Sequence, residues 1–190
     1  MESIIKSLLS EIETRSKNKL SLIIAIDGRC ASGKSTLAKR LQSELPCNLI
    51  HMDHFFLRPE QRTKERSDEP GGNVDYERFL EEVLIPLTSG EDVTYRPFDC
   101  QIMDFSEAVH LPPLPLTIIE GSYSCHPKLR KHHDLKVFLT ISSDEQIRRI
   151  RSRNGDEHTL DFISKWIPLE ERYFEHCHVR DCCDLIYGND

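Results

Sequence analysis

The segment from Gly28 to Thr36 carries the clearest chemical pattern in the sequence. It runs Gly-Arg-Cys-Ala-Ser-Gly-Lys-Ser-Thr and fits G-x-x-x-x-G-K-[ST], the phosphate-binding loop. The glycines of such a loop let backbone N–H groups converge on phosphate oxygens. Lys34 is then placed to reach the β- and γ-phosphates, and Ser35 to bind Mg²⁺. The residues predicted to hold ATP are Gly28, Arg29, Cys30, Ala31, Ser32, Gly33, Lys34, Ser35 and Thr36.

A carboxylate follows the next apolar segment. Asp53 comes directly after residues 48–52, which are expected to form a strand. Ligands of open parallel sheets bind at the carboxyl ends of the strands. A carboxylate at that edge is placed to accept the proton of an attacking hydroxyl or to bind Mg²⁺. The sequence therefore predicts a reaction centre that joins Asp53 to the phosphate-binding loop.

The remaining sequence narrows the class of nucleotide-binding protein. A GTPase should carry the base-reading motif N-K-x-D, and the nearest string, Asn18-Lys-Leu-Ser21, lacks the Asp and precedes the loop. The net charge of −7, from 25 Lys and Arg against 32 Asp and Glu, disfavours nonspecific nucleic-acid binding. It leaves room for an anionic small molecule in a locally positive pocket.

The elements that position these groups alternate between helix and strand. Apolar spacing predicts helices over residues 2–15, 34–45, 75–87, 144–153 and around 166–173. Apolar, β-branched runs predict strands over residues 20–26, 48–52, 116–120, 136–140 and 184–187. The run 93–99 is expected to be extended or to form a short hairpin. Ser143 with Gln146 suggests a capping box, and Gly155 should end that helix. This alternation predicts an α/β fold with a mostly parallel sheet.

Length and composition predict one domain, spanning 1–190, because 190 residues fit one domain of ordinary size. Within it we expect an N-terminal helix over 1–19, a charged substrate-side loop over 54–75 and a lid near 150–165. No run has the roughly 18 apolar residues of a membrane span. The N-terminus has no targeting pattern, so we expect a cytosolic protein.

The seven cysteines show no C-x-x-C pair and no zinc-ligand spacing, which predicts reduced thiols. We expect the cysteines near the C-terminus to be small, buried side chains beside the end of a helix. The oligomeric state is open from the sequence, with a homo-oligomer among the alternatives.

A series of motifs resembles the uridine kinase family, with its nicotinamide riboside kinase, pantothenate kinase and phosphoribulokinase relatives. The resemblance covers about residues 20–187. Its motifs, in chain order, are Ile26-Asp-Gly-Arg-Cys-Ala-Ser-Gly-Lys-Ser-Thr36, Asp53-His-Phe-Phe56, Asn73-Val-Asp-Tyr-Glu-Arg-Phe79, Ile118-Ile-Glu-Gly121 and an Arg-rich helix at 148–153. The phosphate-binding loop alone is generic, whereas the whole series is far more discriminating. The resemblance implies a P-loop three-layer sandwich: a central parallel sheet, helices on both faces and a small lid.

The resemblance also implies roles for individual residues. Asp53 matches the family's general base, Asp75 the acid that holds the ribose hydroxyls, and Glu120 the carboxylate that helps position Mg²⁺. Ser35, Glu120 and Asp53 at neighbouring strand ends would suit one Mg²⁺, which prefers hard oxygen ligands. The expected catalytic residues are Asp53, Lys34, Arg151 and Arg153, the last two in the lid. The expected substrate contacts are Asp53, Phe56, Asp75, Tyr95, Phe98 and Arg148.

The expected reaction is ATP-dependent transfer of the γ-phosphate to a hydroxyl of a small metabolite, with a uridine or cytidine 5′-hydroxyl favoured. Nicotinamide riboside, pantothenate and sugar kinases remain alternatives. So does a nucleoside monophosphate kinase, whose acceptor phosphate would need the cations of Arg58, Arg62, Lys64 and Arg66. A regulatory module that binds ATP without catalysis is the alternative outside enzymes.

Overall fold

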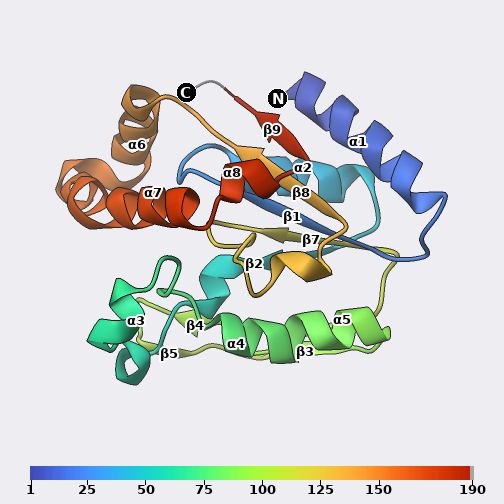
Figure 1. Cartoon of the computed structure of the whole chain (residues 1–190), viewed down its shortest axis with the longest axis horizontal. Helices are drawn as coiled ribbons and strands as arrows, with labels where there is room; N and C mark the ends of the chain where they lie inside the picture. The colour runs from blue at the N-terminus through green and yellow to red at the C-terminus, as the bar shows by residue number, and fades with distance from the viewer. Residues whose placement is uncertain (189–190) are drawn as a thin grey trace.

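A five-stranded parallel sheet forms the centre of the computed structural model, which describes residues 1–188. The strand order is β2-β7-β1-β8-β9, and the strands are stacked in this order from bottom to top in Figure 1. Their bounds are β1 Leu22–Gly28, β2 Asn48–His51, β7 Leu116–Glu120, β8 Leu135–Leu139 and β9 Leu185–Tyr187. β7 has the bounds predicted from the sequence, and the other four strands lie within two residues of their predicted bounds.

The central strand is β1, because β7 and β8 pair with it on either side. All seven residues of β1 are buried, which explains why its sequence is a nearly continuous apolar run rather than an alternating one. The phosphate-binding loop therefore leaves from the most enclosed strand of the sheet. Leu20, expected at the start of this strand, is instead almost fully exposed and precedes it.

Helices α1 and α2 cover one face of the sheet. Their bounds are α1 Glu2–Ser16 and α2 Lys34–Glu44. Leu8 of α1 and Leu37 of α2 are fully buried and share one apolar cluster with Ile24 of β1. The predicted N-terminal helix thus packs on the sheet, and α2 leaves directly from the phosphate-binding loop.

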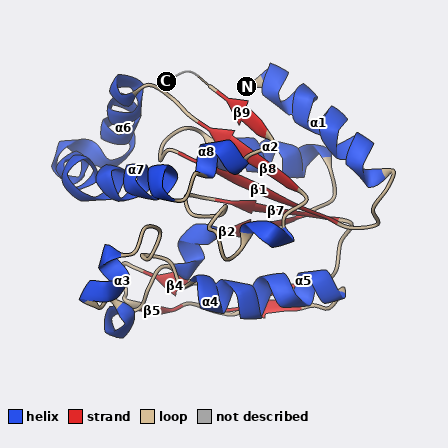
Figure 2. Ribbon diagram, viewed as in Figure 1, coloured by secondary structure: helices blue, strands red, loops and turns tan. Residues whose placement is uncertain are grey.

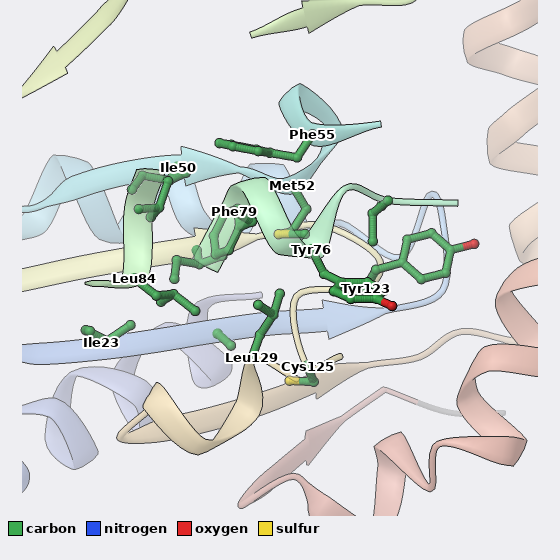
Figure 3. Close-up of a cluster of buried hydrophobic side chains, with 14 of the residues drawn as sticks. Ile23, Ile50, Met52, Phe55, Tyr76, Phe79, Leu84, Tyr123, Cys125 and Leu129 are labelled. Atoms are coloured by element: carbon green, nitrogen blue, oxygen red, sulfur yellow. The ribbon is translucent and has the colours of Figure 1, made fainter. Parts of the chain in front are cut away.

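The opposite face carries a second apolar cluster, drawn in Figure 3. Ile23 of β1 contributes to it, while its neighbour Ile24 belongs to the first cluster, as expected when successive side chains point to opposite faces. The elements on this side are α4 Tyr76–Phe79, η3 Leu80–Leu84, α5 Ile85–Ser89, α7 Ile167–His176 and α8 Val179–Cys182. Helices on both faces confirm the three-layer sandwich, which Figure 2 shows with the strands between the helices.

The predicted helix over 75–87 is present as one continuous helical segment with a π-helical turn in its middle. The turn η3 is followed by Pro86 at the start of α5. Proline has no N–H and its ring crowds the preceding turn, so the regular hydrogen-bond ladder is interrupted there. Gly90, in the left-handed conformation, ends the segment.

The segment 54–75 is more ordered than the exposed loop that its charge predicted. It contains η1 Met52–Phe55, η2 Pro59–Gln61 and α3 Lys64–Asp68. Arg66 organises its end: the guanidinium donates to the carbonyls of Gly72 and Val74 and pairs with Glu77 at 2.6 Å. The charged residues fold the segment because they pair within it.

Two small antiparallel pairs follow. β3 Val93–Tyr95 pairs with β6 Val109–Leu111, and β4 Phe98–Asp99 pairs with β5 Asp104–Phe105. The extended run predicted at 93–99 is therefore one side of a hairpin. A short helix, η4 Arg130–His132, lies between β7 and β8.

The predicted lid lies within α6 Ser143–Asp161 and the π-helical turn η5 Phe162–Trp166. Ser142, rather than Ser143, caps α6, since its Oγ accepts from the N–H of Glu145. Gly155 has non-helical angles (φ 80°, ψ 170°) and kinks α6 instead of ending it. Within residues 1–188, no helix has the length and apolar content needed to cross a membrane.

Candidate functional site

A cavity of about 1110 Å³ opens at the carboxyl edge of the sheet. Its walls come from five parts of the chain: the phosphate-binding loop, the segment 53–73, Cys100 after β4, the turn after β7, and α6 and η5 with the start of α7. Figure 1 shows α6 and α7 on one side of this edge and α3 on the other. The residues predicted from motifs far apart in sequence can therefore meet one ligand here.

Lys34 is the cation at the base of the cavity. Its side chain is buried, and its Nζ donates to the carbonyl oxygens of Gly28 (2.6 Å) and Arg29 (2.9 Å). A third neighbour is the Oγ of Ser122, at 3.3 Å. The loop's own carbonyls thus satisfy the ammonium, which can exchange them for phosphate oxygens.

Ser35 and Glu120 form a pair of hard oxygen ligands beside this lysine. The Ser35 hydroxyl donates to Oε2 of Glu120 at 3.1 Å, and the ring of His51 contacts Oε1. Mg²⁺ is commonly bound by one or two protein oxygens together with substrate phosphates. The donor set fits Mg²⁺, although no group of three His, Cys, Asp or Glu residues suited to a metal occurs in the part of the chain described.

Asp53 faces the cavity, and its carboxylate makes no hydrogen bond or ion pair within residues 1–188. The surrounding walls raise the pKa of Asp53 through desolvation, and the charge of Lys34 opposes this. A raised pKa makes the carboxylate a stronger base, which suits proton abstraction. Of the predicted acids, Asp53 is the one left free to act on a ligand.

Gly28 is required by the close packing of β1 against β8. It has φ +127°, and a Cβ on it would lie 2.0 Å from the Leu139 carbonyl oxygen. The Gly28 N–H donates to the carboxylate of Asp27. The packing against β8 is thus a reason for a glycine at this position that the sequence did not reveal.

Asp27 is a buried carboxylate that the sequence analysis missed. It accepts from the N–H groups of Gly28, Tyr123 and Cys125 and from the Tyr173 hydroxyl at 2.8 Å. Complete burial raises the pKa of Asp27 to about 6. These bonds fix the turn after β7 against the phosphate-binding loop.

The predicted nucleotide-binding residues divide into two groups. Those that line the cavity are Cys30, Ala31, Gly33, Lys34, Ser35 and Thr36. Gly28, Arg29 and Ser32 lie outside its lining. Arg29 turns away because its backbone N–H donates to Leu139 and its guanidinium pairs with Glu171 at 2.8 Å.

The helical repeat determines which arginines of α6 face the cavity. Arg149 and Arg153, one turn apart, face the cavity. Arg148 and Arg151, predicted for substrate binding and catalysis, lie outside its lining. Arg148 pairs with Glu145 at 2.6 Å, and Arg151 with Asp156 at 2.8 Å. The cavity is thus lined by the arginines of one helix face: Arg153, which was predicted to be catalytic, and Arg149, which was given no role.

Three predicted acceptor residues lie away from the cavity lining. Asp75 caps α4: its Oδ1 accepts from the Arg78 N–H and its Oδ2 from Gln61. Tyr95 and Phe98 are buried, and burial raises the pKa of Tyr95 to about 12. Helix capping and core packing occupy these side chains.

The acceptor side of the cavity is instead lined by residues of the segment 53–73. Of the predicted contacts, Phe56 is there beside Asp53. Residues that the sequence did not single out include Asn73, whose Nδ2 has no partner among the described residues, and Tyr123. Asn73 opens the Asn73–Phe79 motif but was given no role there, and Tyr123 belongs to no motif.

No protein-family model matches the chain. A uridine kinase from Clostridium perfringens is 26% identical over 157 residues, covering 76% of this chain and 74% of its own length. The solved structure of a possible uridine kinase from Bacillus stearothermophilus superposes with a TM-score of 0.68 at 21% identity, covering 95% of this chain and 99% of that one.

A D-glycerate 3-kinase from Cryptococcus neoformans has the same fold, with a TM-score of 0.66 at 17% identity over 90% of this chain and 87% of that one. The fold is thus shared by kinases whose names refer to different acceptors. The order of motifs, the parallel sheet and the sequence similarity agree: the chain is similar in sequence to uridine kinases and has the α/β fold of P-loop kinases.

Proposed function

We propose that the chain transfers the γ-phosphate of ATP, with Mg²⁺, to the 5′-hydroxyl of a nucleoside, with uridine and cytidine the favoured acceptors. The observation that carries the proposal is the unengaged carboxylate of Asp53, which faces the same cavity as Lys34 and the Ser35–Glu120 pair. The sequence similarity to uridine kinases supports the choice of acceptor.

In the proposed reaction the acceptor oxygen attacks the γ-phosphorus, and the bond from that phosphorus to the β–γ bridging oxygen breaks. Asp53 takes the hydroxyl proton, and ADP leaves. Phosphoryl transfer asks the protein mainly for positioning and for neutralisation of charge. Lys34, Arg149 and Arg153 supply cations around the transferred group. Mg²⁺, held by Ser35 and Glu120, would neutralise the phosphates further.

Acceptor recognition is assigned to Phe56, Asn73 and Tyr123. Aromatic rings can stack on a base, and the Asn73 amide can donate to a carbonyl or hydroxyl oxygen. Asp75 is not assigned a contact, because its oxygens already accept bonds within the protein. A nucleoside rather than a monophosphate is favoured because, of Arg58, Arg62, Lys64 and Arg66, only Arg62 lines the cavity.

The test is ADP release from Mg-ATP with a panel of acceptors: uridine, cytidine, nicotinamide riboside, pantothenate, ribose and the nucleoside monophosphates. Stimulation by uridine or cytidine supports the proposal. Stimulation by another member alone replaces the acceptor and keeps the reaction. Absence of phosphorylated product, despite ATP binding, rejects these acceptors and points to an acceptor outside the panel or to a regulatory ATP-binding module.

Asp53→Asn is the matched chemical variant, because it keeps the size of the side chain and removes the base. We expect kcat to fall by about 10²–10⁴-fold. Turnover near that of the wild type would remove Asp53 from the mechanism. Asp99→Asn, on a carboxylate outside the cavity lining, serves as the control.

A further inference from the structure

Helix α7 is tied to the phosphate-binding loop by three of its side chains. Tyr173 donates to Asp27, Glu171 pairs with the Arg29 guanidinium, and Glu170 accepts from the Cys30 N–H at 3.0 Å. The first two contacts involve groups outside the cavity lining. Glu170 differs, because both it and Cys30 line the cavity.

Glu170 places a buried carboxylate on a backbone donor of the phosphate-binding loop. Its side chain is only 6% exposed. Oε2 accepts from the Cys30 N–H, one of the loop's backbone donors, and Oε1 accepts from the Ser122 hydroxyl. A carboxylate oxygen and a phosphate oxygen can both accept a hydrogen bond from this N–H, and both are negatively charged.

Ser122, Lys34 and Asp53 lie near Glu170, at the end of the loop that is expected to hold the terminal phosphate. The Ser122 Oγ that bonds to Glu170 is also 3.3 Å from Nζ of Lys34. In phosphate-binding loops this lysine reaches the β- and γ-phosphates. Asp53 lines the same cavity as Lys34 and Glu170. Glu170 is therefore close to the reacting end of the nucleotide.

We propose that Glu170 is a specificity-determining residue that competes with the γ-phosphate for the Cys30 N–H and so sets the affinity for triphosphate relative to diphosphate. This inference rests on the proposed function in taking ATP as the nucleotide. The bound triphosphate must displace or tolerate the carboxylate, whereas ADP leaves that contact in place. The contact stabilises the loop when it is empty, and the same free energy opposes the triphosphate.

Glu170→Gln tests the charge without removing the hydrogen-bonding groups. Glutamine keeps a carbonyl oxygen for the Cys30 N–H and has an amide that can donate to Ser122. We expect the variant to bind a non-hydrolysable ATP analogue about tenfold more tightly, and ADP with less than about a threefold change. KM for ATP should fall without a rise in kcat.

The chain contains its own probe for this titration. Trp166, its single tryptophan, lines the cavity one helical turn before Glu170. Nucleotide binding is followed by its fluorescence and checked by calorimetry. Glu171→Gln is the matched control, because Glu171 is the adjacent acid and contacts the Arg29 side chain rather than a donor in the cavity.

A change in neither nucleotide affinity, or an equal change in both, would overturn the inference, as would the same shift in Glu171→Gln. Glu170→Ala should move the ratio in the same direction, and melting curves establish that each variant is folded. If wild type and variants all fail to bind the triphosphate, the proposed function falls as well. Normal binding with an unaltered ratio refutes the role of Glu170 alone.

Discussion

The position of each arginine around helix α6 determines whether its guanidinium reaches the cavity. Arg149 and Arg153 line it, whereas Arg151 lies on another face and pairs with Asp156. We expect Arg153→Gln to lower kcat about 10- to 100-fold, because a preorganised donor to the transferred phosphoryl group is lost. Steady-state kinetics with Mg-ATP and the acceptor identified by the panel measure this.

Arg151→Gln is the control for that variant, since it removes a guanidinium from the same helix within the same lid. Its kcat should stay within about twofold of the wild type, because exposed ion pairs contribute little. Equal losses in both variants would show that the charge of the lid matters rather than the face of α6.

Asp75 caps a helix in the structure, whereas the family resemblance implies that it binds the acceptor, and two variants can distinguish these roles. Its carboxylate caps α4, so Asp75→Ala should lower the free energy of unfolding by about 1 kcal/mol, while Asp75→Asn should keep most of the cap. Urea denaturation measures both variants. If Asp75 instead binds the acceptor, Asp75→Asn would raise KM for the acceptor while its stability stayed normal.

Strand ends were the part of the site that the sequence could predict. Glu120 ends β7, Asp53 follows β2 by two residues, and Ser35 lies in the first turn of the helix that follows β1. These residues come together because parallel strands end at the same edge of the sheet. Side-chain direction was harder to predict. Asp75 was expected at the site, but helix α4 begins directly after it. Its carboxylate therefore accepts a hydrogen bond from a backbone N–H in the first turn of that helix.

Contacts between distant elements lay beyond the sequence argument. Glu170 belongs to no motif, Asp27 was given no role within the Ile26–Thr36 motif, and their partners Cys30 and Tyr173 lie far away in the chain. Only the packing of α7 beside the phosphate-binding loop brings them together. The role of Gly28 was missed for the same reason, because β8 supplies the atom that excludes a side chain.

The pH dependence of folding belongs to the whole molecule. Burial lowers the pKa of His133 to about 3, and neither ring nitrogen has a partner within the described residues. Below the ordinary histidine pKa of 6.5, the unfolded chain therefore binds a proton here that the folded chain does not. His133 thus makes the protein less stable as the pH falls from about 6.5 towards 3.

Asp27 acts in the opposite sense. Its pKa of about 6 lies above its ordinary value of 3.8, so the folded chain holds a proton that the unfolded chain has lost. Its contribution is present below pH 3.8 and is lost as the pH rises through 6. The two groups therefore oppose each other across mildly acidic pH.

His133→Leu removes one side of this balance. We expect the variant to gain about 1–3 kcal/mol at pH 7, because an imidazole without buried partners is replaced by an apolar side chain. The gain should grow at pH 5. Urea denaturation at the two pH values measures it, and a gain that shrinks at pH 5 would contradict the assignment. His158→Leu, at an exposed position of α6, is the control.

The order of strands has a consequence for how the chain folds as it is synthesised. β1 is made first among the strands and lies at the centre, yet its partners β7 and β8 come much later: Ile24 lies beside Ile118 and Leu135. Long-range parallel pairing slows folding and leaves apolar strands exposed in the meantime. The strand that leads into the phosphate-binding loop therefore waits unpaired until most of the protein has left the ribosome, which makes the nascent chain dependent on protection from aggregation.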